Sequence, residues 1–279
     1  MLKVLKSGFY TTVQDAGRFG LRHKGVPISG AMDMTAMNRV NSLLENEPEA
    51  AVLEITMTGP TLTFEENTYI CIGGAEMSAT LNNEPIENYT LYTITEGDII
   101  SFGKLEQGFR AYLAIKGGFL TDKVLGSRSQ YYPLTSKKRL KDHDEIPFEA
   151  ASNFEIKISE LRVDSHFDEQ TLIVERGPEY DMLTDSQLTS IFSKDFSISK
   201  ENNRMAYQIA EYIDGHSTNM LTSATLPGTV QLTPAGKLII LMKDGQTTGG
   251  YPRILKLTEE AICILAQKKF GDMVNFKLI

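Results

Sequence analysis

The chain has 279 residues, of which 41% are apolar and 23% charged, and its formal net charge is −8. These values are ordinary for a soluble globular protein of one large or two smaller domains, and the acidic balance argues against nucleic-acid binding. No apolar run approaches the roughly 20 residues of a membrane span, and the N-terminus is too short and broken for a signal peptide. We therefore expect a cytoplasmic protein that does not bind membranes.

Short β-type segments dominate the chain from its N-terminal to its C-terminal half. They are alternating or continuous apolar runs, and turn residues separate most of them, which predicts barrels or sandwiches. The predicted strands are residues 52–56, 68–72, 90–95, 99–102, 111–115, 154–158, 171–174 and 238–242.

Two helices are also predicted. Asp33 is a suitable N-cap for a helix that runs to about Leu44 and places Met37, Val40 and Leu44 on one face. Thr258 is a suitable N-cap for a second helix, which Gly271 would end.

A weak internal repeat indicates how the chain is divided. Gly97-Asp98 and Gly271-Asp272 each precede a strand-like segment, and Asp144 begins a looser third copy. Two similar β units in tandem explain the repeat better than one large sheet. We place them at residues 1–150 and 151–279; this boundary is approximate, and an exchange of strands between the halves is compatible with the pattern.

The cysteines and histidines do not predict a metal site. Cys71 and Cys263 lie in apolar runs and are expected to be buried thiols in a reducing compartment. The four histidines are scattered without the spacing of metal ligands.

An N-terminal loop carries the first candidate site residues. Gln14, Asp15 and Arg18 lie close together beside glycines, directly after a β-type segment. Arg18 either forms a structural ion pair with Asp15 or receives a substrate carboxylate while Asp15 or Gln14 accepts an N–H. Ser29 and Gly30 follow at the expected helix start, where exposed N–H groups bind anions well; a purely capping role is equally compatible.

A C-terminal loop carries the second set. Gln246-Thr247-Thr248-Gly249-Gly250-Tyr251 follows an apolar strand and suits a small planar amide or carboxylate, because glycine admits close backbone approach and the polar side chains both donate and accept. A polar hairpin loop is the alternative. Gln231 follows a tight turn in the same way as Gln246, and two inward carboxamides from equivalent strand ends would clamp one amide group.

Several common catalytic motifs are absent from the sequence. It contains neither Gly-x-x-x-x-Gly-Lys-Ser/Thr nor Gly-x-Ser-x-Gly. Met242-Lys243 is similar to a biotinylation site, but Asp244 follows where an apolar residue is expected, so we predict no covalently bound cofactor.

The motifs taken together resemble one known family, called KipA, allophanate hydrolase subunit 2, the C subunit of 5-oxoprolinase, or the biotin-dependent carboxyltransferase family. The resemblance runs in order from about Leu5 to Phe276. Five motifs carry it: Thr11–Gly20 with Gly25–Asp33, Gly126-Ser127-Arg128-Ser129, Asn203-Arg204-Met205-Ala206-Tyr207, Pro227–Gln231 and Gln246–Pro252.

The resemblance implies a mainly β fold of tandem cyclophilin-like β-barrels with a few short helices. It also implies one component of an ATP-dependent 5-oxoprolinase, which opens 5-oxoproline to L-glutamate together with a KipI-like protein (the B subunit) and a LamB/YcsF-like protein (the A subunit). ATP is then expected in the assembled complex. One alternative is a carboxyltransferase component that acts on urea or an amide with carboxybiotin, and another is a KipA-like antagonist of a kinase inhibitor.

On this basis Asp15, Arg18 and Gln246 are the candidate catalytic residues. The candidate substrate-binding residues are Gln14, Ser29, Gly30, Arg204, Tyr207, Gln231, Thr247, Gly249, Gly250 and Tyr251. Arg204 and Tyr207 match the family pattern Ser-Asp/Asn-Arg-Met-Gly-Tyr-Arg, whereas Ala206 and Gln208 depart from it, and a surface turn with a solvated Arg204 is the alternative. The glycines that the family carries after Gly-Ser-Arg-Ser are replaced at residues 130–139, which puts any function of that loop in doubt.

Overall fold

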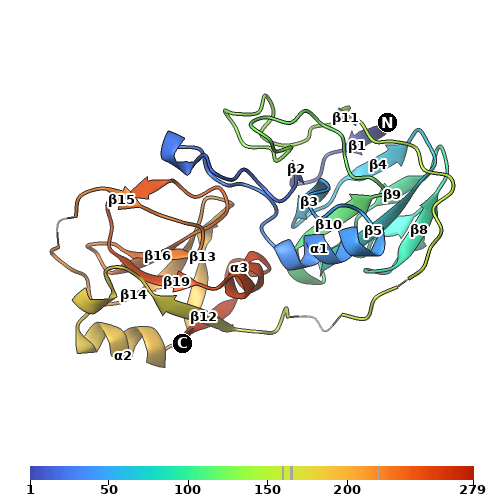
Figure 1. Ribbon diagram of the computed structural model, residues 1–279. Helices are drawn as coiled ribbons and strands as arrows, with labels where there is room; N and C mark the ends of the chain where they lie inside the picture. The colour runs from blue at the N-terminus through green and yellow to red at the C-terminus, as the bar shows by residue number, and fades with distance from the viewer. Residues whose placement is uncertain (159, 164–165, 219) are drawn as a thin grey trace. The chain divides into compact units, whose positions relative to one another are not determined.

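A computed structural model describes residues 1–158, 160–163, 166–218 and 220–279 of the chain. They form two compact units (Figure 1): Met1–Arg18 with Ser29–Ser165, and Phe19–Ile28 with His166–Ile279. The short segment 19–28 thus belongs to the second unit, although the chain on both sides of it belongs to the first. Residues 151–163 go with the first unit, whereas the boundary expected near residue 150 would place them in the second half.

The first unit consists of two antiparallel sheets and one α-helix. One sheet has the strand order β11-β1-β4-β9-β6-β7 and the other the order β2-β3-β10-β5-β8. The elements are β1 (Leu2–Lys6), β2 (Tyr10–Gln14), α1 (Met34–Leu43), β3 (Val52–Thr56), β4 (Thr61–Phe64), β5 (Thr68–Glu76), β6 (Thr80–Leu81), β7 (Glu84–Pro85), β8 (Leu91–Ile94), β9 (Ile99–Ser101), β10 (Gln107–Ile115) and β11 (Glu145–Ile146).

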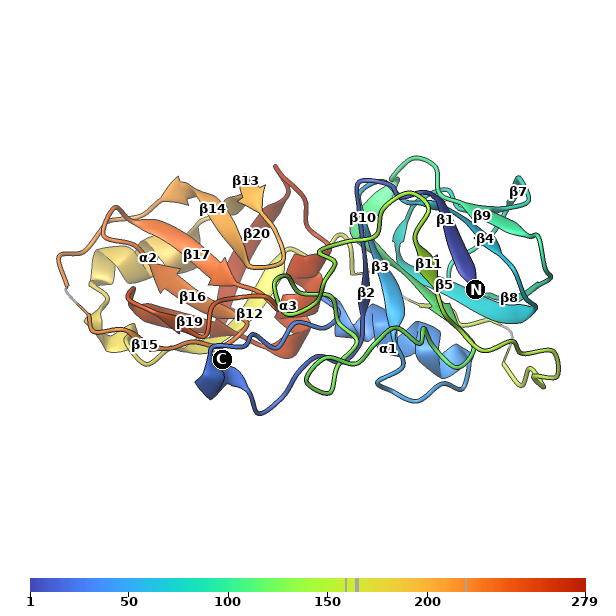
Figure 2. The same cartoon turned by 90° about the horizontal axis from the view of Figure 1, so that it is seen from above.

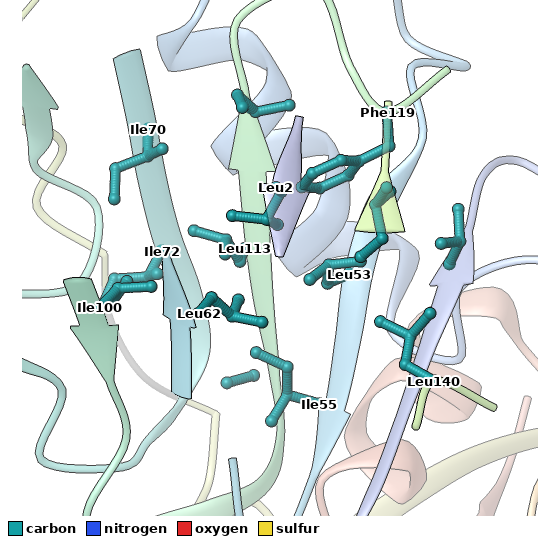
Figure 3. Packing of buried hydrophobic residues seen from close by; sticks show 14 of the residues in the cluster. Leu2, Leu53, Ile55, Leu62, Ile70, Ile72, Ile100, Leu113, Phe119 and Leu140 are labelled. Atoms are coloured by element: carbon teal, nitrogen blue, oxygen red, sulfur yellow. The ribbon is translucent and has the colours of Figure 1, made fainter. Parts of the chain in front are cut away.

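The two sheets of the first unit enclose a single hydrophobic core (Figure 3). Alternate residues of each strand point inward, as the pleat of a strand requires, so that Leu53 and Ile55 of β3 and Ile70 and Ile72 of β5 belong to one cluster with Leu62 of the other sheet. These side chains are at most 2% exposed. Burial of each such side chain contributes about 1.5–3 kcal/mol.

Helix α1 covers the outer face of the second sheet, over β5 and β10. The Asp33 side chain accepts a hydrogen bond from the Ala36 backbone N–H at 3.0 Å, which confirms the predicted N-cap. Met37, Val40 and Leu44 are fully buried in a second cluster that includes Cys71 and Tyr112, which confirms the predicted apolar face.

The second unit is built around a closed barrel of seven strands in the order β12-β19-β16-β17-β14-β13-β20 (Figure 2), and β15 and β18 pair separately. Its elements are η1 (Arg22–Lys24), β12 (Thr171–Arg176), η2 (Tyr180–Met182), α2 (Asp185–Ser193), β13 (Phe196–Asn202), β14 (Ala206–Tyr212), β15 (Ser223–Ala224), β16 (Thr229–Leu232), β17 (Lys237–Leu241), β18 (Thr248–Gly249), β19 (Arg253–Leu257), α3 (Glu259–Ala266) and β20 (Met273–Leu278). The expectation of a mainly β fold with a few short helices is confirmed.

The helices of the second unit begin at conventional caps. Thr258 accepts a hydrogen bond from Ala261 N–H at 3.2 Å, which confirms the predicted start of α3. Helix α2 was not predicted, although Thr184 and Gln187 form a complete capping box at its start. Among the described residues, no helix is long and apolar enough to cross a membrane.

The predicted strand at residues 154–158 is wrong, because this segment is irregular. Phe154 packs edge-on against Tyr69, with ring centroids 5.3 Å apart, and the Lys116 ammonium lies 4.3 Å from the centre of the Phe154 ring. Ile156 and Ile158 are 39% and 61% exposed. The alternating pattern therefore reflects one anchored aromatic ring in a surface segment rather than the buried face of a strand.

Both cysteines are buried, as predicted.

The internal repeat corresponds to one turn that occurs three times. Asp98 Oδ2 accepts a hydrogen bond from Thr95 N–H at 2.8 Å, Asp144 Oδ2 from Lys141 N–H at 2.9 Å, and Asp272 Oδ2 from Lys269 N–H at 2.9 Å. The residue before each aspartate has a positive φ: 91° at Gly97, 69° at His143 and 87° at Gly271. Each turn leads directly into a strand, so the sequence repeat reflects one type of turn that recurs at the start of a strand.

We expect Gly97→Ala and Gly271→Ala each to lower the stability of the protein by about 1 kcal/mol, because a Cβ disfavours positive φ. Nothing lies within 4 Å of the added methyl group at either position, so the backbone conformation alone should account for the loss. Thermal melts will measure it. Gly250→Ala is the matched control, since its Cβ also meets open space and its φ is not in the positive region; an equal loss in the control would contradict this explanation.

Candidate functional site

The predicted site residues fall into two groups, one in each unit. Gln14, Asp15, Arg18, Ser29 and Gly30 belong to the first unit. The second unit contains Arg204, Tyr207, Gln231, Gln246, Thr247, Gly249, Gly250 and Tyr251. Each group is described below within its own unit.

Asp15 joins two loops of the first unit. Its Oδ1 accepts hydrogen bonds from the hydroxyls of Ser127 and Ser129, both at 2.6 Å, and from Gly17 N–H at 2.8 Å. Its Oδ2 accepts one from Arg128 N–H at 2.6 Å. Only 5% of Asp15 is exposed. The carboxylate thus compensates its burial through four donors and fixes the Gly126-Ser127-Arg128-Ser129 motif against the end of β2.

Gln14 and Arg18 support the same pair of loops. Gln14 is fully buried, and its Nε2 donates to Thr12 Oγ1 at 3.0 Å and to the Gln130 carbonyl at 3.3 Å. Arg18 is 1% exposed; its Nε donates to the Val124 carbonyl at 3.0 Å, and its Nη2 donates to the Ser129 carbonyl. These contacts agree better with a structural role for both side chains than with direct contact to a substrate.

Ser29 and Gly30 form a close contact with the loop after β2. Gly30 has a φ of 83°, and a Cβ there would lie 2.8 Å from the Ala16 carbonyl oxygen, so only glycine fits. Ser29 has a φ of 57° and is fully buried. Its hydroxyl has no hydrogen-bond partner within the described part of the chain. The serine therefore lies inside the unit rather than at an open anion site.

The two predicted carboxamides meet in the second unit, at Gly249. A Cβ on this glycine would lie 2.5 Å from Gln231 Nε2 and 2.9 Å from Gln246 Nε2. Gln231 is 1% exposed and its Nε2 donates to the Tyr251 carbonyl at 3.4 Å, whereas Gln246 is exposed. We call Gln231, Gln246 and Gly249 the carboxamide cluster. It presents amide donors and acceptors at a position that only glycine leaves open.

The residues that flank the cluster lie at the surface. Gly250 is exposed and a Cβ there would meet nothing within 4 Å, so Gly249 rather than Gly250 is the glycine of close approach. Tyr251 is 41% exposed and Thr247 is half-buried. The cluster is therefore accessible from solvent on the side of Gln246 and Tyr251.

Arg204 and Tyr207 have structural partners. Arg204 is 5% exposed, so it is not the solvated arginine of a surface turn, and it forms a two-point ion pair with Asp244, with Nε–Oδ2 and Nη2–Oδ1 distances of 2.8 and 3.1 Å. Tyr207 is fully buried, and its hydroxyl donates to the Lys268 carbonyl at 3.0 Å. Tyr207 thus lies inside the unit, where substrate binding by this residue stays a prediction, and the Arg204–Asp244 pair stabilises the turn after β17.

Two residues that the sequence motifs did not indicate lie beside the carboxamide cluster. Arg22, in the segment 19–28 of the second unit, donates from Nη2 to the carbonyls of Thr225 and Gln246 at 2.6 and 3.1 Å. Thr225 Oγ1 donates to the same Gln246 carbonyl at 2.6 Å. The sequence signal for Arg22 is its place in the Gly-rich N-terminal loop, close to Asp15 and Arg18, which were predicted as site residues.

Two lysines of the second unit have partners within it, Lys256 at the Pro227-Gly228 turn and Lys243 at the start of α3. Lys243 is 8% exposed and its Nζ lies 3.2 Å from Glu259 Oε2. Lys256 donates to the carbonyls of Pro227 and Leu257, and burial is the main cause that lowers its pKa. The burial and ion pair of Lys243 are unlike the exposed hairpin lysine that biotinylation requires.

Comparison with known proteins identifies the family. The model of the carboxyltransferase domain, subdomain A and B, matches residues 24–278, so the chain belongs to this family. Over 99% of its length the chain is 32% identical to the C subunit of 5-oxoprolinase from Escherichia coli K12, and it covers 90% of that protein. It is 29% identical to the C subunit of 5-oxoprolinase from Haemophilus influenzae, over all of the chain and 91% of the relative.

Solved structures share the fold. The crystal structure of TTHA0988 superposes with a TM-score of 0.90 at 24% identity over 99% of this chain. The Kluyveromyces lactis urea amidolyase superposes with a TM-score of 0.89 at 26% identity. The chain spans 55% of the first and 18% of the second, so both neighbours contain regions beyond the shared fold. The family model and the two 5-oxoprolinase relatives, rather than these structures, confirm the resemblance inferred from the motifs.

We expect Asp15→Asn to destabilise the first unit by about 1–3 kcal/mol, because the substituted amide offers a donor where the Ser127, Ser129 and Arg128 donors need an acceptor. Thermal melts of the purified chain will measure the loss. A variant that melts like the parent but loses function in the assembled protein would instead support the catalytic assignment of Asp15.

We expect Gly249→Ala to displace the carboxamides of Gln231 and Gln246, since the added methyl group occupies their contact position. Both neighbours are the flexible ends of side chains, so the stability loss should stay within about 1 kcal/mol. The side-chain amide signals of the two glutamines in NMR spectra, assigned with Gln→Leu variants, should shift. Gly250→Ala is the control and should leave both signals in place.

Proposed function

We propose that this protein is the C subunit of an ATP-dependent 5-oxoprolinase and takes part in opening 5-oxoproline to L-glutamate. The observation that carries the proposal is the similarity to the corresponding 5-oxoprolinase chain of Escherichia coli over 99% of this chain and 90% of that protein. Similarity over nearly the whole of both chains means that the compared proteins share one overall architecture rather than one module.

The carboxamide cluster supplies chemistry that suits this substrate. Hydrolysis of the lactam adds a hydroxyl to the carbonyl carbon and a proton to the ring nitrogen. A site for it needs donors to the amide oxygen and an acceptor for the N–H. Gln231 and Gln246 each carry both kinds of group, and the missing side chain of Gly249 leaves room for both carboxamides to lie together.

The rest of the chemistry comes from partner proteins in this proposal. The sequence contains no phosphate-binding Walker motif and no nucleophile with a neighbouring base, so we assign the ATP site and the proton transfers to a KipI-like protein and a LamB/YcsF-like protein. ATP supplies the free energy for ring opening when it is bound. The isolated chain is then inactive. We place the complex in the cytoplasm, in keeping with the two buried free thiols.

Carboxyl transfer is the second candidate function. The matching family model is that of a carboxyltransferase domain, and a urea amidolyase of Lachancea kluyveri is 28% identical over 98% of this chain, although the chain covers only 17% of that protein. In this case the carboxamide cluster would hold the planar ureido group of urea or of carboxybiotin, and a biotin carboxylase and carrier would be the partners.

We expect glutamate to be released from 5-oxoproline only when this chain, the KipI-like protein and the LamB/YcsF-like protein are combined with ATP. Glutamate release by the three-protein mixture is measured beside each mixture that lacks one of them. Size-exclusion chromatography should show co-elution with the KipI-like protein through an interface of about 1,200 Å² or more.

Two outcomes would contradict the proposal. Glutamate release by the mixture without this chain would remove its role in the reaction. ATP-dependent carboxylation of urea by a mixture that contains biotin carboxylase and carrier, with no 5-oxoproline turnover by the three-protein mixture, would favour the second candidate.

A further inference from the structure

Arg22 is anchored to the carboxamide cluster through the backbone. Its Nη2 donates to the carbonyls of both Thr225 and Gln246, and the Thr225 hydroxyl donates to the same Gln246 carbonyl. Thr225 also lies beside Gly249, because a Cβ on that glycine would be 3.4 Å from Thr225 Cγ2. One guanidinium nitrogen thus holds the loop that positions Gln246 and borders Gly249.

No carboxylate among the described residues pairs with the charge of Arg22. Its second terminal nitrogen, Nη1, is buried and has no hydrogen-bond partner among the residues that the structure describes. Burial is the cause that lowers the pKa of Arg22, and no described carboxylate pairs with it. A buried guanidinium nitrogen without an acceptor is energetically costly, which points to an acceptor that a ligand supplies.

Two other arginines of the second unit differ in this respect. Arg204 holds Asp244 through two nitrogens, and Arg253 holds Glu179 in the same way, with Nε–Oε2 and Nη2–Oε1 distances of 2.9 and 2.6 Å. Both guanidiniums already bind a carboxylate of the protein itself. Arg22 instead donates from Nη2 to two backbone carbonyls, so its charge is available to a second anion.

We propose that Arg22 binds the carboxylate of a small cyclic-amide acid whose amide group lies at the carboxamide cluster. The proposal rests on the proposed function for the amide part of the ligand, and it assigns the carboxylate to a residue that sequence motifs alone did not select. A planar guanidinium suits a carboxylate because its donors form a rigid fork. Arg22 would thereby make the site selective for ligands that carry a carboxylate over neutral lactams of the same size.

The test compares two ligands on the assembled three-protein complex. 5-Oxoproline carries the carboxylate, and 2-pyrrolidinone is the same ring without it. We expect the wild-type complex to bind 5-oxoproline more tightly than 2-pyrrolidinone. Arg22→Gln should weaken the binding of 5-oxoproline on the order of tenfold to a hundredfold and leave the binding of 2-pyrrolidinone unchanged. Dissociation constants from ligand-observed NMR, together with KM and kcat for 5-oxoproline, measure the effect.

Lys24→Gln is the matched control, because it removes one positive charge from the same short helix at an exposed side chain. It should keep the preference for 5-oxoproline. An Arg22→Gln protein that folds and retains the full preference would overturn the proposal, since a merely structural arginine would not change the ratio between the two ligands. If Arg22→Gln fails to fold, the NMR signal of the Arg22 guanidinium in the wild-type protein decides: a shift with 5-oxoproline but not with 2-pyrrolidinone supports the proposal, and no shift overturns it.

The outcome can be separated from that of the proposed function. If the three-protein mixture releases no glutamate, the purified chain is titrated with sodium acetate. A saturable shift of the Arg22 signal that Lys24→Gln keeps would support the carboxylate site although the oxoprolinase function had failed. The absence of any acetate effect at Arg22 would overturn the site as well.

Discussion

The Asp15 carboxylate is the interaction on which the arrangement of the N-terminal loops depends. A buried carboxylate needs hydrogen bonds to replace its lost hydration, and Asp15 receives four of them from Gly17, Ser127, Arg128 and Ser129. Because these donors come from two loops far apart in the sequence, the single charge fixes both at once. The Gly30 contact with Ala16, within the same unit, then fixes the chain just before α1 against the chain just after β2.

Close backbone approach has the corresponding role in the second unit. Gly249 pairs with Ser223 in the short β15–β18 ladder, and its missing side chain is the space into which the amide groups of Gln231 and Gln246 point. Arg253 donates to the Ala224 carbonyl and Arg22 to the Thr225 carbonyl, so two guanidiniums hold consecutive peptide groups of this loop. The cluster is thus supported by charge-assisted hydrogen bonds to the backbone, which keep a surface loop in one conformation.

Local signals in the sequence predicted much of the fold. Caps at Asp33 and Thr258 were correct because a cap is decided by residues within one turn of the helix. The repeated aspartate turn was visible for the same reason, since the side chain bonds to an N–H only three residues away. The irregular segment at residues 154–158 was predicted wrongly because its apolar pattern is explained by a contact with Tyr69, far away in the sequence. The closure of the second unit into a barrel, through the parallel pairing of β12 with β20, also depends on long-range contacts.

In the candidate site, too, the sequence does not predict the long-range contacts that decide the role of each arginine. Arg18, Arg22 and Arg204 all stand in polar loops with nearby glycines or asparagines, and the sequence alone does not separate them. Their surroundings do: Arg18 is 1% exposed and donates to the carbonyls of Val124 and Ser129, Arg204 binds Asp244 at two points, and Arg22 is half-buried with no described carboxylate partner. Motif spacing indicates where guanidiniums gather, but the function of each depends on which acceptors the fold has already supplied. An arginine whose charge the protein has already neutralised stabilises a loop, whereas one that is desolvated without an anion gains the most from a ligand that brings one.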